Sequence, residues 1–329
     1  MMRAVVQQGF GGTEQLSVQE LPDPTPGEGE VLVRVTAAGV DRGTVHLLTG
    51  LPLAGRPYFG FRTPRFPVVG RDVSGTVAAL GPGVEGIEVG QQVIGTADGS
   101  VAELAVVPVS RLAVLPADLP GDLGPVELAA LPVSGLTALQ GLAKAHRGKG
   151  VRPGDRVLVI GASGGVGSSA VQLAAAAGAE VTGVASAAKA DLVRDLGATR
   201  VLDYAAGPLD DGTRYDLVLV TGGTHRLRDL RRLLVREGTL VLAGGESDNR
   251  LTAGAHRQLL AMLWSPFVPQ QLLGLMSRES GEDLAALVEH VAEGRLRPAV
   301  DRTFPLSQTP EALEELIAGR VRGKAVITV

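Results

Sequence analysis

Two different patterns of hydrophobic positions divide the chain. Up to residue 115 the apolar residues form short runs, many of which alternate with polar residues. Clusters of Gly and Pro separate these runs, as in residues 22–30. This pattern predicts β-strands joined by turns. The expected strands are residues 3–7, 15–20, 31–38, 73–80, 92–95, 101–107 and 112–115.

The pattern changes after residue 125. Residues 126–142 are apolar and helix-prone, and from residue 156 short apolar runs alternate with longer helical segments. Such alternation predicts parallel strands joined by right-handed crossovers. The expected strands are residues 157–160, 181–184, 200–202, 217–220 and 240–243. The expected helices lie near residues 165–177, 188–196 and 226–236, with a further amphipathic helix at 282–293.

The end of the chain predicts a return to the first pattern. A strand at 297–304, a helix at 311–318 and a strand at 325–329 are expected to rejoin the β-rich part. The 329 residues suffice for two domains. We therefore expect a β-rich domain of residues 1–125 and 296–329, and an α/β domain of residues 126–295.

A glycine-rich turn joins the first parallel strand to its helix. The turn reads GASGGVG from Gly161 to Gly167, directly after the apolar run VLVI. A strand, a glycine turn and a helix in this order hold a dinucleotide pyrophosphate on the helix N-terminus. The residues expected to contact the cofactor here are Ser163, Gly164, Gly165 and Val166.

The end of the second parallel strand indicates which cofactor is bound. NAD-binding proteins usually place Asp or Glu there for the ribose 2′-hydroxyl, whereas this chain has Ser186 and, three residues later, Lys189. A carboxylate would repel a 2′-phosphate, while a hydroxyl and an ammonium would bind it. The sequence thus favours NADPH. The alternative is that Lys189 is an ordinary solvated lysine at the start of a helix.

Composition excludes several classes of protein. The net charge is −4 and the basic residues are scattered, so no nucleic-acid surface is expected. The chain has no Cys, which excludes disulfides, zinc–thiolate sites and cysteine nucleophiles. No apolar run approaches membrane-spanning length and no signal-like segment is present, which favours a cytoplasmic protein that has no membrane partner.

Several motifs resemble the medium-chain dehydrogenase/reductase superfamily. They are residues 37–41 (AAGVD), 69–77 (VGRDVSGTV), 136–140 (LTALQ) and 152–159 (RPGDRVLV), together with the turn ASGGVG. The turn is similar to that of the zinc-independent, zeta-crystallin-like quinone oxidoreductases, whose members also carry a Tyr where Tyr204 stands. The resemblance implies a GroES-like β-rich catalytic domain and a Rossmann domain with a doubly wound parallel sheet. It also implies a homodimer, formed through the sheet edge after Ala243 and the stretch 262–276. That stretch could instead line the pocket or be core, and its aromatic and Met residues favour core, although Pro266 and Pro269 argue against one continuous helix.

The sequence departs from the zinc alcohol dehydrogenases at both ligand positions. Asp41 stands where those enzymes have a Cys ligand, and Arg71 stands where they have a His ligand. An arginine cannot lose its proton to bind zinc, so we expect no metal. Arg71 and Asp72 are expected to form a structural ion pair.

The candidate catalytic residues lie just after the third strand and in a long loop at 51–66, which we expect to cover the cleft. They are Asp41, Thr44, His46 and Tyr58. His46 could relay a proton or be a hydrogen-bonded core residue, and Tyr58 could donate a proton or pack. Further cofactor contacts are expected from Thr137, Thr221 and Gly244, the last beside Gly245.

These features predict an NADPH-dependent, zinc-free oxidoreductase. It would transfer hydride to a quinone or an α,β-unsaturated carbonyl, because a conjugated acceptor spreads the negative charge that zinc would otherwise stabilise. Two alternatives remain: a zinc-free carbonyl reductase or alcohol dehydrogenase on the same scaffold, and a non-catalytic NADPH-binding protein. Substrate turnover distinguishes all three.

Overall fold

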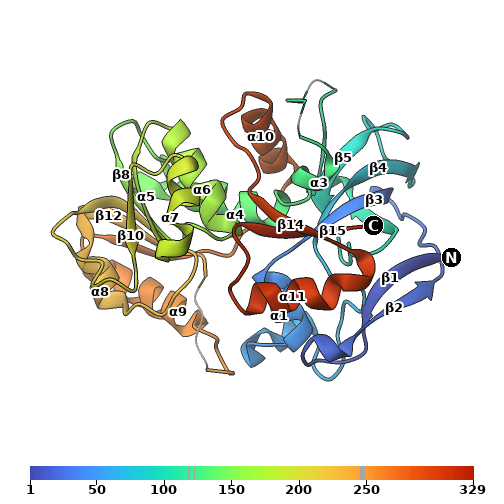
Figure 1. Cartoon of the computed structure of the whole chain (residues 1–329), viewed down its shortest axis with the longest axis horizontal. Coiled ribbons are helices and arrows are strands. Elements are labelled where there is room, and N and C mark those ends of the chain that lie inside the picture. Colours follow the sequence, from blue (N-terminus) through green and yellow to red (C-terminus); the bar gives the residue numbers. More distant parts are fainter. Residues whose placement is uncertain (118, 122, 245–248) are drawn as a thin grey trace. The chain divides into compact units, whose positions relative to one another are not determined.

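The computed structural model describes residues 1–329 except 118, 122 and 245–248. The chain forms two units (Figure 1). The first contains residues Met1–Leu136, Glu279–Gly294 and Pro298–Val329, and the second contains Thr137–Arg278 and Arg295–Arg297. The sequence-based division at residues 125 and 295 differs from these bounds mainly in α10 (Gly281–Ala292), which packs on strand β7 of the first unit.

The first unit is built on a mixed sheet. Its strand order is β14-β15-β3-β4-β5-β7, and β6 pairs with β3. The bounds are β3 Glu30–Val40, β4 Asp72–Leu80, β5 Gln92–Thr96, β6 Leu104–Pro108, β7 Leu112–Val114, β14 Val300–Pro305 and β15 Lys324–Thr328. A separate pair is formed by β1 (Met2–Gln7) and β2 (Leu16–Leu21). In β3, alternating burial gives way to four consecutive buried residues at its end, because packing there covers both faces of the sheet.

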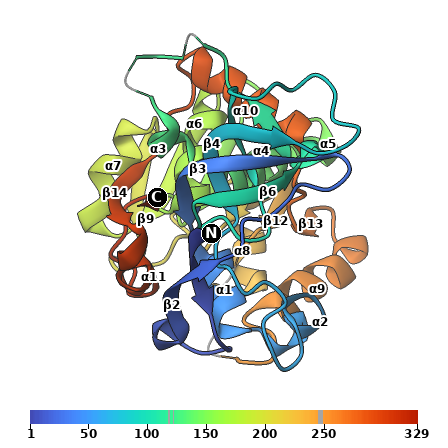
Figure 2. The same ribbon diagram turned by 90° about the vertical axis from the view of Figure 1, so that its right-hand side faces the viewer.

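Helices α3 (Pro125–Leu128), α10 (Gly281–Ala292) and α11 (Thr309–Ile317) of this unit pack on its sheet, while α1 (Arg42–Thr49) packs on α11 and α2 (Arg56–Phe59) lies away from the sheet (Figure 2). Helix α11 is amphipathic and buries Ala312 and Leu313 against β15 and α1. The C-terminal return is confirmed, because β15 pairs with both β14 and β3.

The second unit contains a parallel sheet of order β10-β9-β8-β11-β12-β13 within the described residues. The strands are β8 Arg156–Ile160, β9 Glu180–Ala185, β10 Arg200–Asp203, β11 Tyr215–Val220, β12 Leu234–Leu242 and β13 Gln271–Gly274. The helices are α5 Ala145–Gly148, α6 Gly165–Ala176, α7 Ala190–Asp195, α8 Leu227–Arg232 and α9 Ala255–Trp264, and α4 (Pro132–Leu142) runs from the first unit into the second. Strand order reverses between β8 and β11, which is where doubly wound sheets bind ligands.

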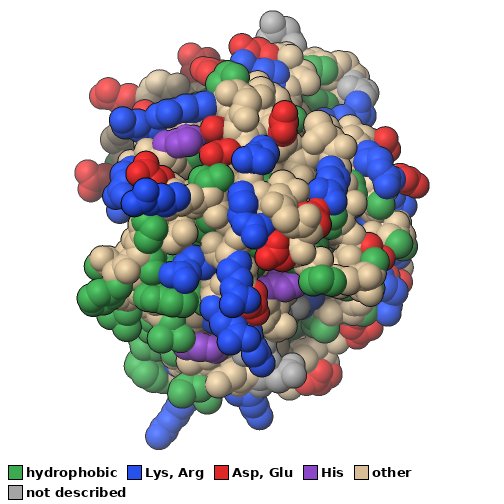
Figure 3. Space-filling view, turned by 90° about the vertical axis from the view of Figure 1, so that its left-hand side faces the viewer, with side chains coloured by type: hydrophobic (Ala, Val, Ile, Leu, Met, Phe, Trp, Pro, Cys, Tyr) green, Lys and Arg blue, Asp and Glu red, His purple; other side chains and the backbone are tan. Residues whose placement is uncertain are grey.

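One prediction about this unit is wrong, and another holds only in part. The helix expected at 226–236 ends at Arg232, because the apolar residues that follow begin β12. The stretch 262–276 is core only in part. It contains the end of α9 and the edge strand β13, and Leu272 and Leu275 are buried, whereas Leu263, Phe267 and Met276 are 70%, 82% and 89% exposed. Figure 3 views the left-hand side of Figure 1, and hydrophobic side chains gather at its lower left edge.

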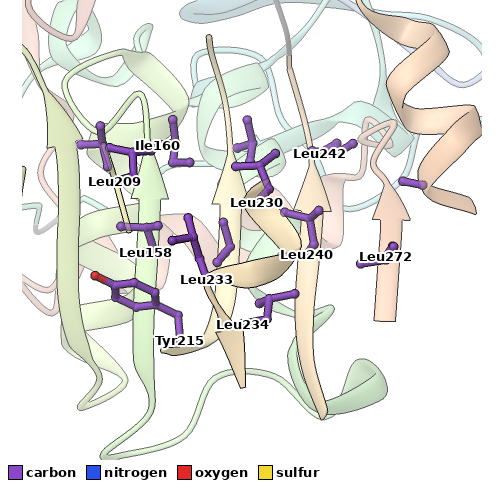
Figure 4. Close-up of a cluster of buried hydrophobic side chains, with 14 residues drawn as sticks. Leu158, Ile160, Leu209, Tyr215, Leu230, Leu233, Leu234, Leu240, Leu242 and Leu272 are labelled. Carbon is purple, nitrogen blue, oxygen red and sulfur yellow. The ribbon is translucent and has the colours of Figure 1, made fainter. Parts of the chain in front are cut away.

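One part of the core of the second unit is a layer of mostly leucine and valine side chains between strands and α8 (Figure 4). Leu158, Val218 and Leu240 come from β8, β11 and β12, and Leu230 comes from α8. All four side chains are at most 1% exposed. Full burial of each side chain stabilises the fold by roughly 1.5–3 kcal/mol. This packing holds the strands, and with them the strand ends that carry the candidate site. Among the described residues, no helix is long and apolar enough to cross a membrane.

Candidate functional site

The glycine turn after β8 has the geometry of a phosphate cradle. Gly161 has a φ of +85°, a backbone conformation that residues other than glycine rarely adopt. A Cβ at Gly167 would lie 2.1 Å from the Gly161 carbonyl oxygen, so only glycine lets α6 pack this closely. Gly164 is the N-cap of α6 and has no side chain to cap the helix. The first N–H groups of α6 therefore remain available to an anion.

Two further predicted residues hold this turn in place from neighbouring strands. Thr221, at the end of β11, donates from Oγ1 to the Ile160 carbonyl oxygen at 2.9 Å. Gly244, after β12, lies so close that its Cβ would be 2.5 Å from the Thr221 carbonyl oxygen. The structure thus brings Thr221 and Gly244 to the same edge of the sheet as the glycine turn. Gly245 lies outside the described residues.

The ends of β9 and β10 bring together the groups predicted to meet a 2′-phosphate. Ala185 of β9 pairs with Asp203 of β10, so the residues that follow them, Ser186 and Tyr204, leave the sheet side by side. Tyr204 is 58% exposed. Lys189 closes the short 3₁₀ turn that begins after Ser186. The carboxylate of Asp203 accepts a hydrogen bond from the Ala205 N–H at 2.9 Å, so its charge is held by the backbone.

Thr137 lies on α4 and is bonded to a residue that the sequence did not indicate. Its Oγ1 donates to the Ser277 Oγ at 3.0 Å. One turn further along the helix, Gln140 exchanges two hydrogen bonds with the backbone of Arg278, at 2.8 and 2.9 Å. These bonds fix the segment after β13 to α4. No motif in the sequence marks Ser277, because the pairing spans 140 residues.

In the first unit, Asp41 and Thr44 form the N-terminal cap of α1. The Thr44 N–H donates to Asp41 Oδ1 at 3.0 Å, and the Thr44 side chain accepts from the Asp41 N–H at 3.4 Å. Burial alone would raise the pKa of Asp41, but the charge of Lys324 and the bonds to Thr44 outweigh it and hold the pKa below its usual value. Asp41 is therefore an ionised cap, a role that its residue type favours.

Asp72 pairs with Lys324. Lys324 Nζ lies 2.7 Å from Asp72 Oδ2, and both side chains are buried. Burial raises the pKa of Asp72 to about 6, although the ammonium opposes that shift. Burial lowers the pKa of Lys324, but the carboxylates of Asp72 and Asp41 outweigh it and leave the pKa above its usual value. Sequence reasoning missed Lys324, because 252 residues separate it from its partner.

The expected ion pair between Arg71 and Asp72 is wrong. Arg71 directly precedes β4, whose first residue is Asp72, and the Asp72 carboxylate bonds Lys324. Arg71 bonds the carboxylates of Asp98 and Glu279 instead. Burial lowers the pKa of Arg71, but Glu279 and the other negative groups outweigh it, so the guanidinium stays charged.

His46 and Tyr58 occupy different environments in the first unit. His46 lies on α1 and is half-buried. Tyr58 lies on α2, is 48% exposed, and packs its ring at 5.8 Å from Phe59 and 5.6 Å from Phe66. Arg56 fastens the surrounding loop, since its guanidinium donates to the carbonyl oxygens of Gly50 and Phe61, each at 2.8 Å.

The donor sets in the described part of the chain do not suit a metal ion. No group of three or more His, Asp or Glu side chains is assembled there. Asp41 uses its oxygens on α1 and Lys324, and Arg71 is a cation. The zinc ligands of related dehydrogenases therefore have no equivalent at these two positions.

Comparison with known proteins identifies the class. Residues 27–117 match the alcohol dehydrogenase GroES-like domain, and residues 196–327 match the zinc-binding dehydrogenase family. The chain is 32% identical to the chloroplastic quinone oxidoreductase QR1 of Triphysaria versicolor, an alignment that covers 99% of this chain and 98% of the relative. The chain belongs to the medium-chain dehydrogenase/reductase superfamily of oxidoreductases.

Solved structures agree with this class. The quinone oxidoreductase of Coxiella burnetii superimposes with a TM-score of 0.84 at 28% identity, over 100% of this chain and 99% of that chain. A mycobacterial protein in complex with NADPH superimposes with a TM-score of 0.79 at 27% identity, over 100% of both chains. The resemblance to the quinone oxidoreductase branch and the fold of a GroES-like unit and a Rossmann unit are both confirmed.

Proposed function

We propose that the protein is an NADPH-dependent, zinc-free reductase of quinones or α,β-unsaturated carbonyls. One observation carries the cofactor assignment: the glycine turn is followed, at the ends of β9 and β10, by Ser186, Lys189 and Tyr204 in place of a carboxylate. When bound, NADPH supplies a hydride. The helix N-terminus of α6 would hold its pyrophosphate, and Ser186, Lys189 and Tyr204 would hold its 2′-phosphate.

The chemistry of the first unit supports a conjugated acceptor. Negative charge builds on an acceptor oxygen during reduction and must be stabilised. Asp41 is occupied by its helix cap and Lys324, and Arg71 by two carboxylates, so neither can bind zinc. A quinone or enone spreads that charge over its own conjugated system. Such acceptors need weaker support from the protein than a simple ketone does.

If a side chain supplies the final proton, His46 or Tyr58 is the best candidate by position; the alternative source is water or a cofactor hydroxyl. The Thr44 side chain is held in the cap with Asp41 and is 1% exposed, which leaves it poorly placed for proton transfer. His46 is half-buried on the same helix, and Tyr58 is more exposed on the neighbouring α2. A histidine or a tyrosine side chain can act as a general acid when it is placed against the acceptor.

Steady-state kinetics with a panel of acceptors tests this proposal. We expect kcat/KM for 1,4-naphthoquinone or an enone to exceed that for saturated ketones, with NADPH preferred to NADH. Removal of a general acid costs about 10²–10⁴-fold, so His46→Ala or Tyr58→Phe should lower kcat by that range. Faster oxidation of simple alcohols would favour an alcohol dehydrogenase, and cofactor binding without turnover of any acceptor would favour a non-catalytic protein.

We also propose that the protein is a homodimer. Strand β13 has one neighbour, β12, in the described sheet, so its other edge is open. Beside it, Leu259 and Leu263 of α9 and Phe267 after it are 63%, 70% and 82% exposed. Open strand edges and large apolar patches mark association surfaces. A second copy would cover both.

A further inference from the structure

Three neighbouring strands bring one lysine and two aspartates to the same place in the first unit. Val40 of β3 pairs with Ala325 of β15, so Asp41 directly after β3 faces Lys324. Strand β4 pairs with the other side of β3 and begins at Asp72. Lys324 Nζ lies 2.7 Å from Asp72 Oδ2 and 3.5 Å from Asp41 Oδ2.

Each carboxylate uses its second oxygen to cap a helix. Asp41 Oδ1 accepts from the Thr44 N–H of α1 at 3.0 Å, and Asp72 Oδ1 accepts from the Val133 N–H of α4 at 2.7 Å. Two carboxylates and one ammonium leave an excess negative charge. The positive ends of the two helices offset it, since each is equivalent to roughly half an elementary charge. The cluster is thereby balanced only while both helices stay in place.

The surrounding backbone leaves the cluster no freedom to shift. A Cβ at Gly39 would lie 2.7 Å from Asp72 Oδ2 and 2.3 Å from the Ala129 carbonyl oxygen. Gly323, just before the lysine, has a φ of +93°. The side chains of Lys324 and Asp72 are 3% and 0% exposed, whereas that of Asp41 is 15% exposed. The cluster is thus a fixed point in the unit that reaches solvent only at Asp41.

We propose that Lys324 is a positioning residue that couples helices α1 and α4. Its ammonium orients both capping carboxylates, and these set the first turns of the helices that carry His46 and Thr137. Lys324 acts through Asp41 and Asp72, since it is buried between them. The catalytic consequence rests on the proposed function, whereas the coupling of the two helices does not.

Hydrogen exchange tests the coupling without any assay of activity. In Lys324→Met, we expect amides in the first turns of both α1 and α4 to exchange at least tenfold faster than in the parent, while those of α11 are unchanged. Lys324→Arg keeps the charge with a different shape and should give an intermediate effect. Exchange at the parent rate in both helices of Lys324→Met would overturn the proposal, whatever reaction the protein catalyses.

Kinetics separates positioning from simple charge balance. The double variant Lys324→Met/Asp72→Asn has the same net charge as the parent. We expect its unfolding midpoint to exceed that of Lys324→Met, while kcat with NADPH and 1,4-naphthoquinone stays at least tenfold below the parent and the Kd for NADPH changes less than twofold. Recovery of kcat to the parent value would mean that Lys324 only balances the charge of Asp72, and it would overturn the proposal. If Lys324→Met does not fold, hydrogen exchange and kcat are measured on the double variant and on Lys324→Arg instead. Parent values of both quantities in both variants would then overturn the proposal.

Discussion

Gly167→Ala should damage the cofactor cradle by forcing α6 away from β8. The new Cβ would lie 2.1 Å from the Gly161 carbonyl oxygen and 2.7 Å from Ala162 Cα. Because a carbon–oxygen contact normally needs about 3.3 Å, the helix or the turn must move by about 1 Å. Overpacking of this kind costs about 1–3 kcal/mol of stability, and a displacement of this size can cost about 100-fold in kcat/KM. Urea unfolding and steady-state kinetics measure the two effects.

Gly164→Ala is the matched control in the same turn. Its Cβ would meet only the Gly161 carbonyl oxygen, at an ordinary 3.5 Å, and its φ of −90° is accessible to alanine. We therefore expect the free energy of unfolding to change by less than about 0.5 kcal/mol. NADPH affinity should nevertheless fall, because in the proposed site the backbone of Gly164 approaches the pyrophosphate closely. Unchanged affinity in Gly164→Ala would refute the assignment of this turn as the cradle, and unchanged stability in Gly167→Ala would refute the close packing of α6 on it.

Four further predictions follow from the site and its surroundings. Lys189→Ala should lose about tenfold or more in NADPH affinity with little change for NADH, since a charge-assisted bond contributes roughly 1.5–3 kcal/mol; titration with both cofactors measures this, and equal losses would count against a 2′-phosphate contact. Protein treated with EDTA should keep its full activity; restoration of lost activity by zinc would contradict this. Light scattering at micromolar concentration should give twice the mass of the chain, and a monomer mass would exclude the dimer. Burial raises the pKa of Asp72 from the usual 3.8 to about 6, so the folded state binds this proton more tightly than the unfolded state does. The stability of the parent relative to Asp72→Asn should therefore increase as the pH falls from 7 to 4 in urea unfolding, and a pH-independent difference would refute the shift.

Local patterns account for the parts of the fold that the sequence predicts well. The alternation of strands and helices from residue 156 and the glycine turn depend on neighbouring residues, and both are present as expected. The C-terminal return to the first unit is also present, since its strand–helix–strand pattern is complete within about 30 residues.

Predictions failed where a residue's partner is distant or its surroundings decide its structure. The apolar residues after Arg232 led to the prediction of a longer helix, although they begin β12. Helix α9 and strand β13 were not predicted, because Pro266 and Pro269 interrupt an apolar stretch whose exposed side chains resemble core residues. The partners of Arg71 are separated from it by 27 and 208 residues. No periodic pattern can show pairings of that kind.

The charged residues near the end of β3, whose partners the sequence did not reveal, also bear on the proposed function. In this chain a lysine from the last strand supplies the cation that holds Asp41 and Asp72, so the carboxylates have no unshared oxygen to offer a metal. The residue at the other former ligand position, Arg71, is neutralised by Asp98 and Glu279. Both positions are thus committed to holding the unit together. On the proposed function, neither position stabilises an oxyanion as a metal would, so the acceptor would carry much of its own negative charge. That property separates quinones and enones from simple ketones, and it is the physical basis for expecting them as substrates.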